Sequence, residues 1–73
     1  MNQSKVAIII LNWNGADYTV NCLSSLKKSH FSNYKIFLAD NNSRPNDLLK
    51  IKKFVNLEFN EYQLKLIENK ENY

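Results

Sequence analysis

One uninterrupted apolar run, from Val6 to Leu11, constrains the fold of this chain most strongly. The run is rich in β-branched residues and shows no alternation with polar residues, which is typical of a parallel strand covered on both faces. Six residues are too few for the apolar region of a signal peptide or for a transmembrane span. We therefore expect a central strand of a parallel sheet here.

Beyond a turn at residues 12–15 the apolar spacing becomes helical, and residues 17–30 are predicted to form a helix. Asp17 is the expected N-cap, and Lys27, Lys28 and His30 would complement the negative end of the helix dipole. The predicted inner face consists of apolar side chains at helical spacing: Tyr18, Cys22, Leu23 and Leu26.

A second apolar strand is expected over residues 34–39, and a second helix opens at residues 44–47, with Ser43 or Asn46 as N-cap and Pro45 in its first turn. Its predicted inner face is Leu48, Leu49, Ile51 and Val55. Residues 56–62 are ambiguous, and residues 63–68 are predicted to form a third strand. The order β-α-β-α-β with short loops indicates an α/β fold, Rossmann-like, with three parallel strands.

The composition and the distribution of charge argue against some classes of function. The 73 residues are 44% hydrophobic and carry a net charge of +3, with the basic residues spread along the chain, so we expect no nucleic-acid partner. Lys50, Lys52 and Lys53 are interpreted as a solvated helix face. The single cysteine, Cys22, has no metal-ligand spacing around it and is interpreted as a small core residue, which favours a cytoplasmic location. Peripheral contact with the inner face of a membrane stays open.

Two polar clusters follow the first two strands, at residues 12–15 and 40–43. The carboxyl ends of parallel strands share one edge of a sheet, where ligands bind, so the clusters predict one pocket. Gly15 is the only glycine, which excludes a dinucleotide fingerprint and a P-loop. The aromatic ring, amides and carboxylate of these two clusters are suited to stacking on a nucleotide base and to hydrogen-bonding the base edge or a ribose hydroxyl. From the pattern alone, an interpretation without a ligand is equally good: Trp13 would pack against the first helix, and residues 40–43 would form an ordinary turn with an N-cap.

Three segments in order, VAIIILNWNGADYTVNCLSSL, YKIFLADNNS and LKLIENKENY, resemble the start of the family 2 glycosyltransferases with the GT-A fold. The similarity is closest to the rhamnosyltransferase-like branch, which decorates bacterial surface polysaccharides. It extends over nearly the whole chain and weakens between about residues 54 and 62. The resemblance implies that residues 1–73 are an incomplete N-terminal nucleotide-binding portion of such a domain.

The resemblance also implies which residues contact the donor, a UDP- or dTDP-sugar. Asp40 would hydrogen-bond the edge of the base, and residues 68–72 would border the nucleotide. The implied donor-binding residues are Leu11, Asn12, Trp13, Asn14, Asp40, Asn42 and Ser43. Complete family enzymes hold Mg2+ or Mn2+ on an Asp-x-Asp motif and use a later carboxylate as general base for transfer to a saccharide acceptor. Neither group occurs in these residues, so we expect no catalytic residue, no metal ligand and no transfer by this chain alone.

Two alternatives stay open: a stand-alone small α/β nucleotide-binding or regulatory module, and a truncated interaction fragment without ligand. The resemblance also implies the strand order 3-2-1, which leaves residues 6–11 at an edge. No lysine, proline or bulge guards this edge, so we expect self-association through residues 6–11.

Overall fold

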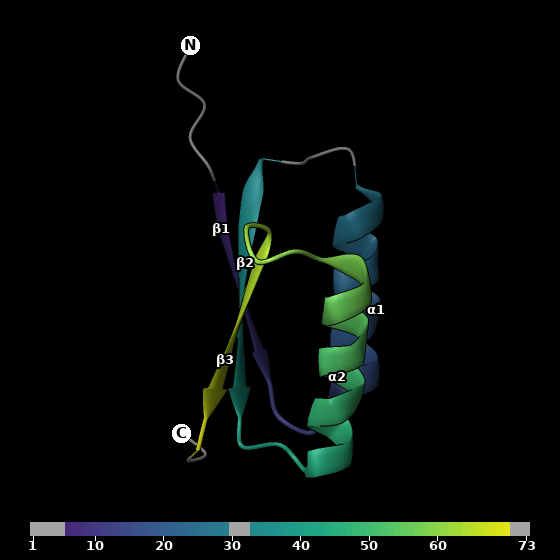
Figure 1. Ribbon diagram of the computed structural model, residues 1–73, viewed down its shortest axis with the longest axis vertical. Coiled ribbons are helices and arrows are strands. Elements are labelled where there is room, and N and C mark those ends of the chain that lie inside the picture. Colours follow the sequence, from purple (N-terminus) through teal and green to yellow (C-terminus); the bar gives the residue numbers. More distant parts are fainter. Residues whose placement is uncertain (1–5, 30–32, 71–73) are drawn as a thin grey trace.

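The structure, a computed structural model, describes residues 6–29 and 33–70. Three strands and two helices alternate along the chain (Figure 1). The elements are β1 (Val6–Asn12), α1 (Ala16–Lys28), β2 (Tyr34–Asn41), α2 (Pro45–Glu58) and β3 (Leu64–Asn69). The predicted α/β class and the element order are confirmed, while His30, expected at the end of the first helix, lies outside the described residues.

The strands form one parallel sheet in the order β1-β2-β3, so β1 is an edge strand, as the resemblance implied. Both helices lie on the same side of the sheet (Figure 1). This follows from chain geometry: two right-handed crossovers that step in the same direction place both helices on one face. In the described part of the chain the opposite face carries no helix. The prediction that the first strand is covered on both faces is therefore wrong for these residues.

The alternation of the strands separates a covered face from an uncovered face. Ile36 and Leu38 point toward the helices and are fully buried, whereas Ile9 is 72% exposed and Leu11 69% exposed on the uncovered face. An exposed apolar set of this kind is unusual on a monomeric soluble domain. Thus the apolar run at residues 6–11 is continuous in sequence but is covered on one side only.

The core lies between the sheet and the two helices, where Leu23 of α1 and Ile51 of α2 are fully buried. On α1 the buried face consists of Ala16, Thr19 and Leu23, while Cys22 is only half-buried. Tyr18 is 77% exposed, so its predicted place on the inner face is wrong. Thr19 takes part in the buried face instead, where its hydroxyl donates a hydrogen bond to Oδ1 of Asn12, and the predicted Leu23 and Leu26 do pack on the core side.

The helix starts also differ in detail from the predictions. Gly15, not Asp17, is the N-cap of α1, and it has no side chain that could accept a capping hydrogen bond from the N–H groups of the first turn. Arg44 is the N-cap of α2 without a side-chain hydrogen bond, so neither Ser43 nor Asn46 has the predicted role. Pro45 does lie in the first turn, as expected. The hydroxyl of Ser43 is bound elsewhere, to the carboxylate of Asp40.

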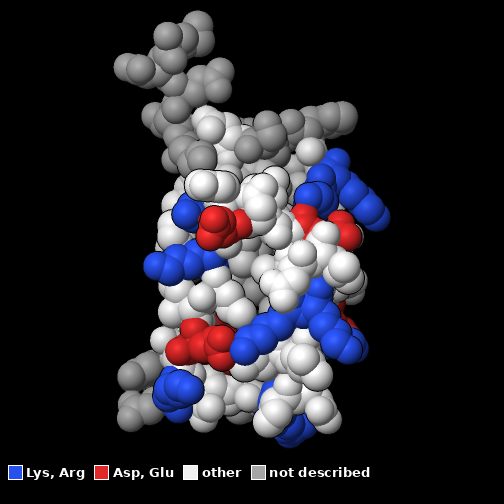
Figure 2. Space-filling model, in the orientation of Figure 1, with Lys and Arg blue, Asp and Glu red and all other residues white. Residues whose placement is uncertain are grey.

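The inner face of α2 is narrower than expected. Ile51 is fully buried and Val55 packs against the core, but Leu49 is half-exposed and does not belong to this face. Lys50 and Lys52 form ion pairs with Asp17 and Glu68 at the surface. On the face drawn in Figure 2, basic and acidic side chains are interspersed. The lysines of α2 are thus on a solvated face.

Candidate functional site at the carboxyl edge of the sheet

The first two strands end at the same level, because the register pairs Asn12 of β1 with Asp40 of β2. Each strand continues in backbone pairing beyond the predicted end at Leu11 and Ala39. The polar side chains that follow the apolar runs are therefore mounted on regular strand backbone. This places the two loops at residues 13–15 and 42–44 beside each other, as the sequence predicted.

Asn12 is at the centre of a buried hydrogen-bond network and is only 2% exposed. Its Nδ2 donates to Oδ1 of Asp40 at 2.8 Å and to Oγ of Ser43 at 3.0 Å. Its Oδ1 accepts a hydrogen bond of 2.6 Å from the hydroxyl of Thr19. Both ends of this amide are satisfied by the protein itself, which is the usual requirement for burying it.

Asp40 is 1% exposed and uses both carboxylate oxygens. Oδ1 accepts from the hydroxyl of Ser43 at 2.6 Å, and Oδ2 accepts from the backbone N–H of Ser43 at 3.0 Å. Burial opposes the charged form and would raise the pKa of Asp40. The hydrogen bonds from Ser43 and Asn12, with the charge of Lys52, outweigh it and hold the pKa of Asp40 below its ordinary value.

Asp47, in the first turn of α2, ties the two helices to this network. Its Oδ1 accepts from the backbone N–H of Ala16 at 2.9 Å, and its Oδ2 accepts from Nδ2 of Asn12 at 3.2 Å. A carboxylate from one helix thus satisfies a free donor at the N-terminus of the other. Sequence reasoning missed Thr19 and Asp47. In the sequence, Thr19 could be noticed only as a polar residue at a buried position of the first helix. Asp47 could be noticed only as an acidic residue in the first turn of the second helix.

The two loops are also joined directly. Asn14 has a left-handed backbone with φ 51°, and Asn42 in the other loop has φ 61°. Asparagine adopts this conformation more readily than other residues with a side chain. The N–H of Asn14 donates to Oγ of Ser43 at 2.9 Å, and its Oδ1 accepts from the N–H of Arg44 at 2.8 Å. Each loop therefore fixes the other.

The side chains that face solvent at this edge belong to a different subset of the predicted site. Trp13 is 59% exposed, and Leu11 and Asn42 are exposed as well. Asn41, which the sequence reasoning left out, is half-buried beside them: its Oδ1 accepts from Nδ2 of Asn69 at 2.8 Å. In the described residues its own Nδ2 has no hydrogen-bond acceptor. The structure thus brings all the predicted residues together, but in two layers, one buried and one exposed.

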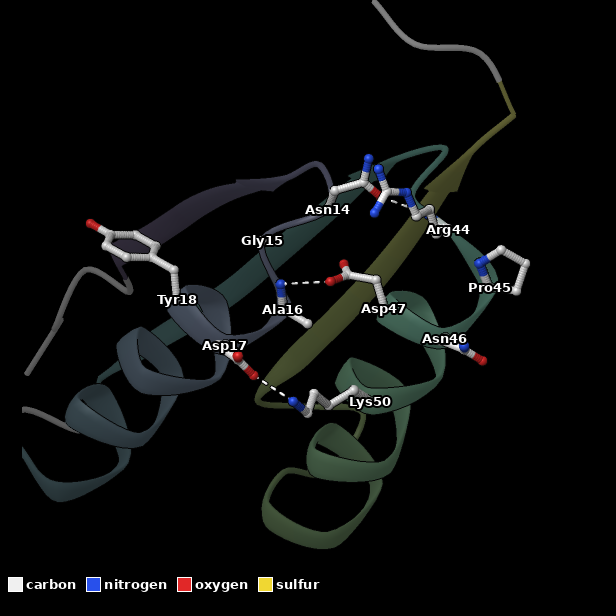
Figure 3. Close-up of a pocket in the computed structure, with 10 residues that line it drawn as sticks. All are labelled: Asn14, Gly15, Ala16, Asp17, Tyr18, Arg44, Pro45, Asn46, Asp47 and Lys50. Atoms are coloured by element: carbon white, nitrogen blue, oxygen red, sulfur yellow. Dashed lines mark hydrogen bonds and ion pairs between the residues drawn. The ribbon is translucent and has the colours of Figure 1, made fainter.

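A cleft of about 760 Å³ opens between the N-terminal ends of α1 and α2 (Figure 3). Among the predicted site residues only Asn14 lines it. Figure 3 shows Asp17 and Lys50 reaching toward each other across the cleft, where their charged groups are 2.5 Å apart. The cleft is thus polar and bridged by an ion pair, and it adjoins the loops on the side of the helices.

The described residues do not fit a divalent metal. No group of three or more His, Cys, Asp or Glu side chains in residues 6–29 and 33–70 is arranged to hold one. Asp40 and Asp47, the carboxylates nearest the loops, already accept hydrogen bonds from Ser43 and Ala16.

The sequence model of the family described as glycosyl transferase family 2 matches residues 7–73. This chain belongs to glycosyltransferase family 2. The match includes β1 from its second residue, the other four elements and both polar loops. Membership of this family suggests that the full enzyme binds a nucleotide-sugar donor. Of the implied border segment, Glu68, Asn69 and Lys70 are described, whereas Glu71 and Asn72 lie outside the described residues.

The glycosyltransferase segment contains no membrane-spanning helix in its described part: neither α1 nor α2 is long and apolar enough to cross a bilayer.

Proposed function

We propose that this chain forms the base-recognising edge of a glycosyltransferase that uses a UDP- or dTDP-sugar donor and a saccharide acceptor, in the rhamnosyltransferase-like branch of the family. The observation that carries the proposal is the two-layer arrangement at the ends of β1 and β2. An exposed aromatic ring and exposed amides are mounted on a buried network that is satisfied without them. Such preorganisation lowers the entropic cost of binding.

In the exposed layer, Trp13 provides a flat surface on which a pyrimidine base can stack. The Nδ2 of Asn41, which has no acceptor among residues 6–29 and 33–70, is a hydrogen-bond donor suited to a carbonyl oxygen of uracil or thymine. Leu11 supplies apolar contact beside it, and Asn42 reaches the ribose. Stacking of a base on an aromatic side chain contributes about 1–3 kcal/mol, so Trp13 is the largest single contributor in this proposal.

In the buried layer, Asn12, Asp40 and Ser43 hold the two loops at a fixed separation, and Asn14 joins them. The resemblance implies direct contact between Asp40 and the base. In the structure both Asp40 oxygens accept hydrogen bonds from within the protein, so we propose that Asp40 acts mainly by positioning Asn41 and Asn42.

The test is a calorimetric titration of the chain with UDP, dTDP and ADP. We expect binding of the pyrimidine nucleotides in preference to ADP, and a loss of affinity of about tenfold or more in Trp13→Ala, because the stacking surface is removed. Tyr62→Ala is the matched control: Tyr62 is also an exposed aromatic residue, but it precedes β3 and so lies at the opposite end of the strands from the polar loops. Absence of measurable heat at millimolar UDP and dTDP would contradict donor binding by this chain and favour the ligand-free interaction fragment.

A second pair of variants separates contact from positioning. Asn41→Ala should weaken UDP binding and leave the free energy of unfolding nearly unchanged, because the side chain is only half-buried. Asp40→Asn should lower both affinity and stability. If Asp40→Asn kept full stability and lost binding, direct contact of Asp40 with the base would be the correct role.

A further inference from the structure

Asn41 and Asn69 are the last pair of residues in the register between β2 and β3. Asp40, one position earlier in β2, is buried on the helix side, so the alternation of the strand turns Asn41 to the opposite face. Both asparagine side chains are half-buried, and both are carried by regular strand backbone and not by a loop. This pair of amides is therefore a fixed part of the carboxyl edge.

One hydrogen bond fixes which end of the Asn41 amide is available to a ligand. Nδ2 of Asn69 donates to Oδ1 of Asn41 at 2.8 Å. An asparagine amide has an acceptor at one end and two donors at the other, and it can present either end when nothing holds it. Rotation of the Asn41 amide alone would bring its NH2 group against the NH2 group of Asn69 and would lose the bond. Asn69 therefore makes Asn41 present a donor.

We infer that Asn69 is a positioning residue, which makes this site select bases with a keto group, uracil and thymine, over cytosine. The inference rests on the proposed function, because it requires that Asn41 meets the edge of the base. Uracil and thymine have at C4 a carbonyl oxygen that accepts from Nδ2 of Asn41. Cytosine has an amino group at the same place, so two donors would face each other. A desolvated donor without an acceptor costs enough binding free energy for one contact to discriminate strongly.

The surroundings of the amide pair fit this role. Asn12 pairs with Asp40 in the register of β1 and β2. The next residues along these strands, Trp13 and Asn41, therefore leave that row at the same level, and a base stacked on Trp13 can reach the Asn41 amide with its edge. Asp40 offers no competing contact, because both of its oxygens accept hydrogen bonds from Ser43. The selecting contact is thus the amide that Asn69 orients.

The test is a calorimetric titration with UDP and CDP, which differ only in the base. The ratio of their dissociation constants reports base selection, and changes that act on the shared ribose and diphosphate cancel in it. The parent chain should bind UDP about tenfold or more tightly than CDP. Asn69→Ala should bring the ratio close to one, because Asn41 can then turn either end to the base. Asn69→Asp should reverse the preference, because a carboxylate only accepts hydrogen bonds and would hold Nδ2 of Asn41.

Asn56→Asp is the matched control, since it makes the same change at an exposed asparagine near the C-terminal end of α2, and it should keep the parent ratio. In the ligand-free parent chain, NMR should detect a coupling across the hydrogen bond from Nδ2 of Asn69 to Cγ of Asn41. A coupling in the opposite direction would overturn the role of Asn69 without any ligand or variant. UDP binding with an unchanged ratio in both Asn69 variants would overturn this role alone, whereas no binding of either nucleotide would contradict the proposed function itself.

Discussion

At the scale of single residues, Asn12 does the most to define the site. Its amide links Asp40, Ser43 and Thr19, which come from β2, from the loop after it and from α1. A buried network of this kind is stabilising when every member is paired, and the loss of one member leaves another buried group unpaired. Changes at these positions are therefore expected to affect stability and loop geometry together.

Replacement of Thr19 by valine tests the least obvious member of the network. Valine keeps the shape but removes the hydroxyl that donates to Oδ1 of Asn12, so a buried acceptor loses its partner. We expect a loss of about 1–3 kcal/mol in the free energy of unfolding, measured by urea denaturation. Thr19→Ser retains the hydroxyl and is the control; an equal loss in both variants would show that packing, not the hydrogen bond, matters here.

The lowered pKa of Asp40 predicts an acid-sensitive contribution to stability. The folded state holds the carboxylate ionised more strongly than the unfolded chain does, so protonation favours unfolding. The contribution is fully present above the ordinary pKa of 3.8 and is lost as the pH falls through the lower folded value. In Asp40→Asn the free energy of unfolding should be smaller at neutral pH and should fall less steeply in acid. Parallel curves for the two proteins would contradict this assignment.

At the scale of elements, the two helices are positioned by their contacts with the sheet more than by their own caps. Neither α1 nor α2 has a side-chain N-cap, and the first turn of α1 is instead capped by Asp47 from α2. This explains why cap patterns in the sequence misplaced Asp17 and Ser43. An N-terminal donor can be satisfied by any nearby acceptor, and only the packing of the helices brings Asp47 there.

The corrected orientation of α1 predicts unequal effects of two substitutions on the same helix. Leu23→Ala removes a fully buried side chain and should cost about 3–5 kcal/mol in the free energy of unfolding. Tyr18→Ala changes an exposed side chain and should stay within about 0.5 kcal/mol of the parent chain. Thermal denaturation followed by circular dichroism measures both. A large loss for Tyr18→Ala would place it back on the inner face.

The backbone alternation of β1 predicts a contrast between adjacent proline substitutions. The N–H of Val6 donates to the carbonyl of Asn33, toward β2, and directions alternate along the strand, so the N–H of Ile9 points away from β2. Ile9→Pro therefore removes no hydrogen bond to β2 and should leave the chain folded. The N–H of Ile10 points to β2, so Ile10→Pro should disrupt the sheet at a cost of about 3 kcal/mol or more. Circular dichroism and amide hydrogen exchange of β2 distinguish the two. Equal disruption would contradict the assigned direction.

At the scale of the whole molecule, this family 2 segment is a two-layer structure with helices on one side of its sheet (Figure 1). The core is confined to that side, and a chain of 73 residues buries only about 60% of the surface exposed by its unfolded form. Within the described residues, the exposed apolar side chains of the uncovered face, such as Ile9 and Leu11, lie outside this core.

The sequence by itself determined the alternation of three strands and two helices, the parallel sheet and the meeting of the two polar loops. These depend on local periodicity and on the handedness of the crossovers, which act over short segments. Only the tertiary structure decided that Asp40 is buried while Trp13 and Asn41 remain accessible, and that Tyr18 faces solvent. The reason is physical: which side of a strand or helix is buried depends on register and on the layer packed against it, and neither is encoded in any one segment.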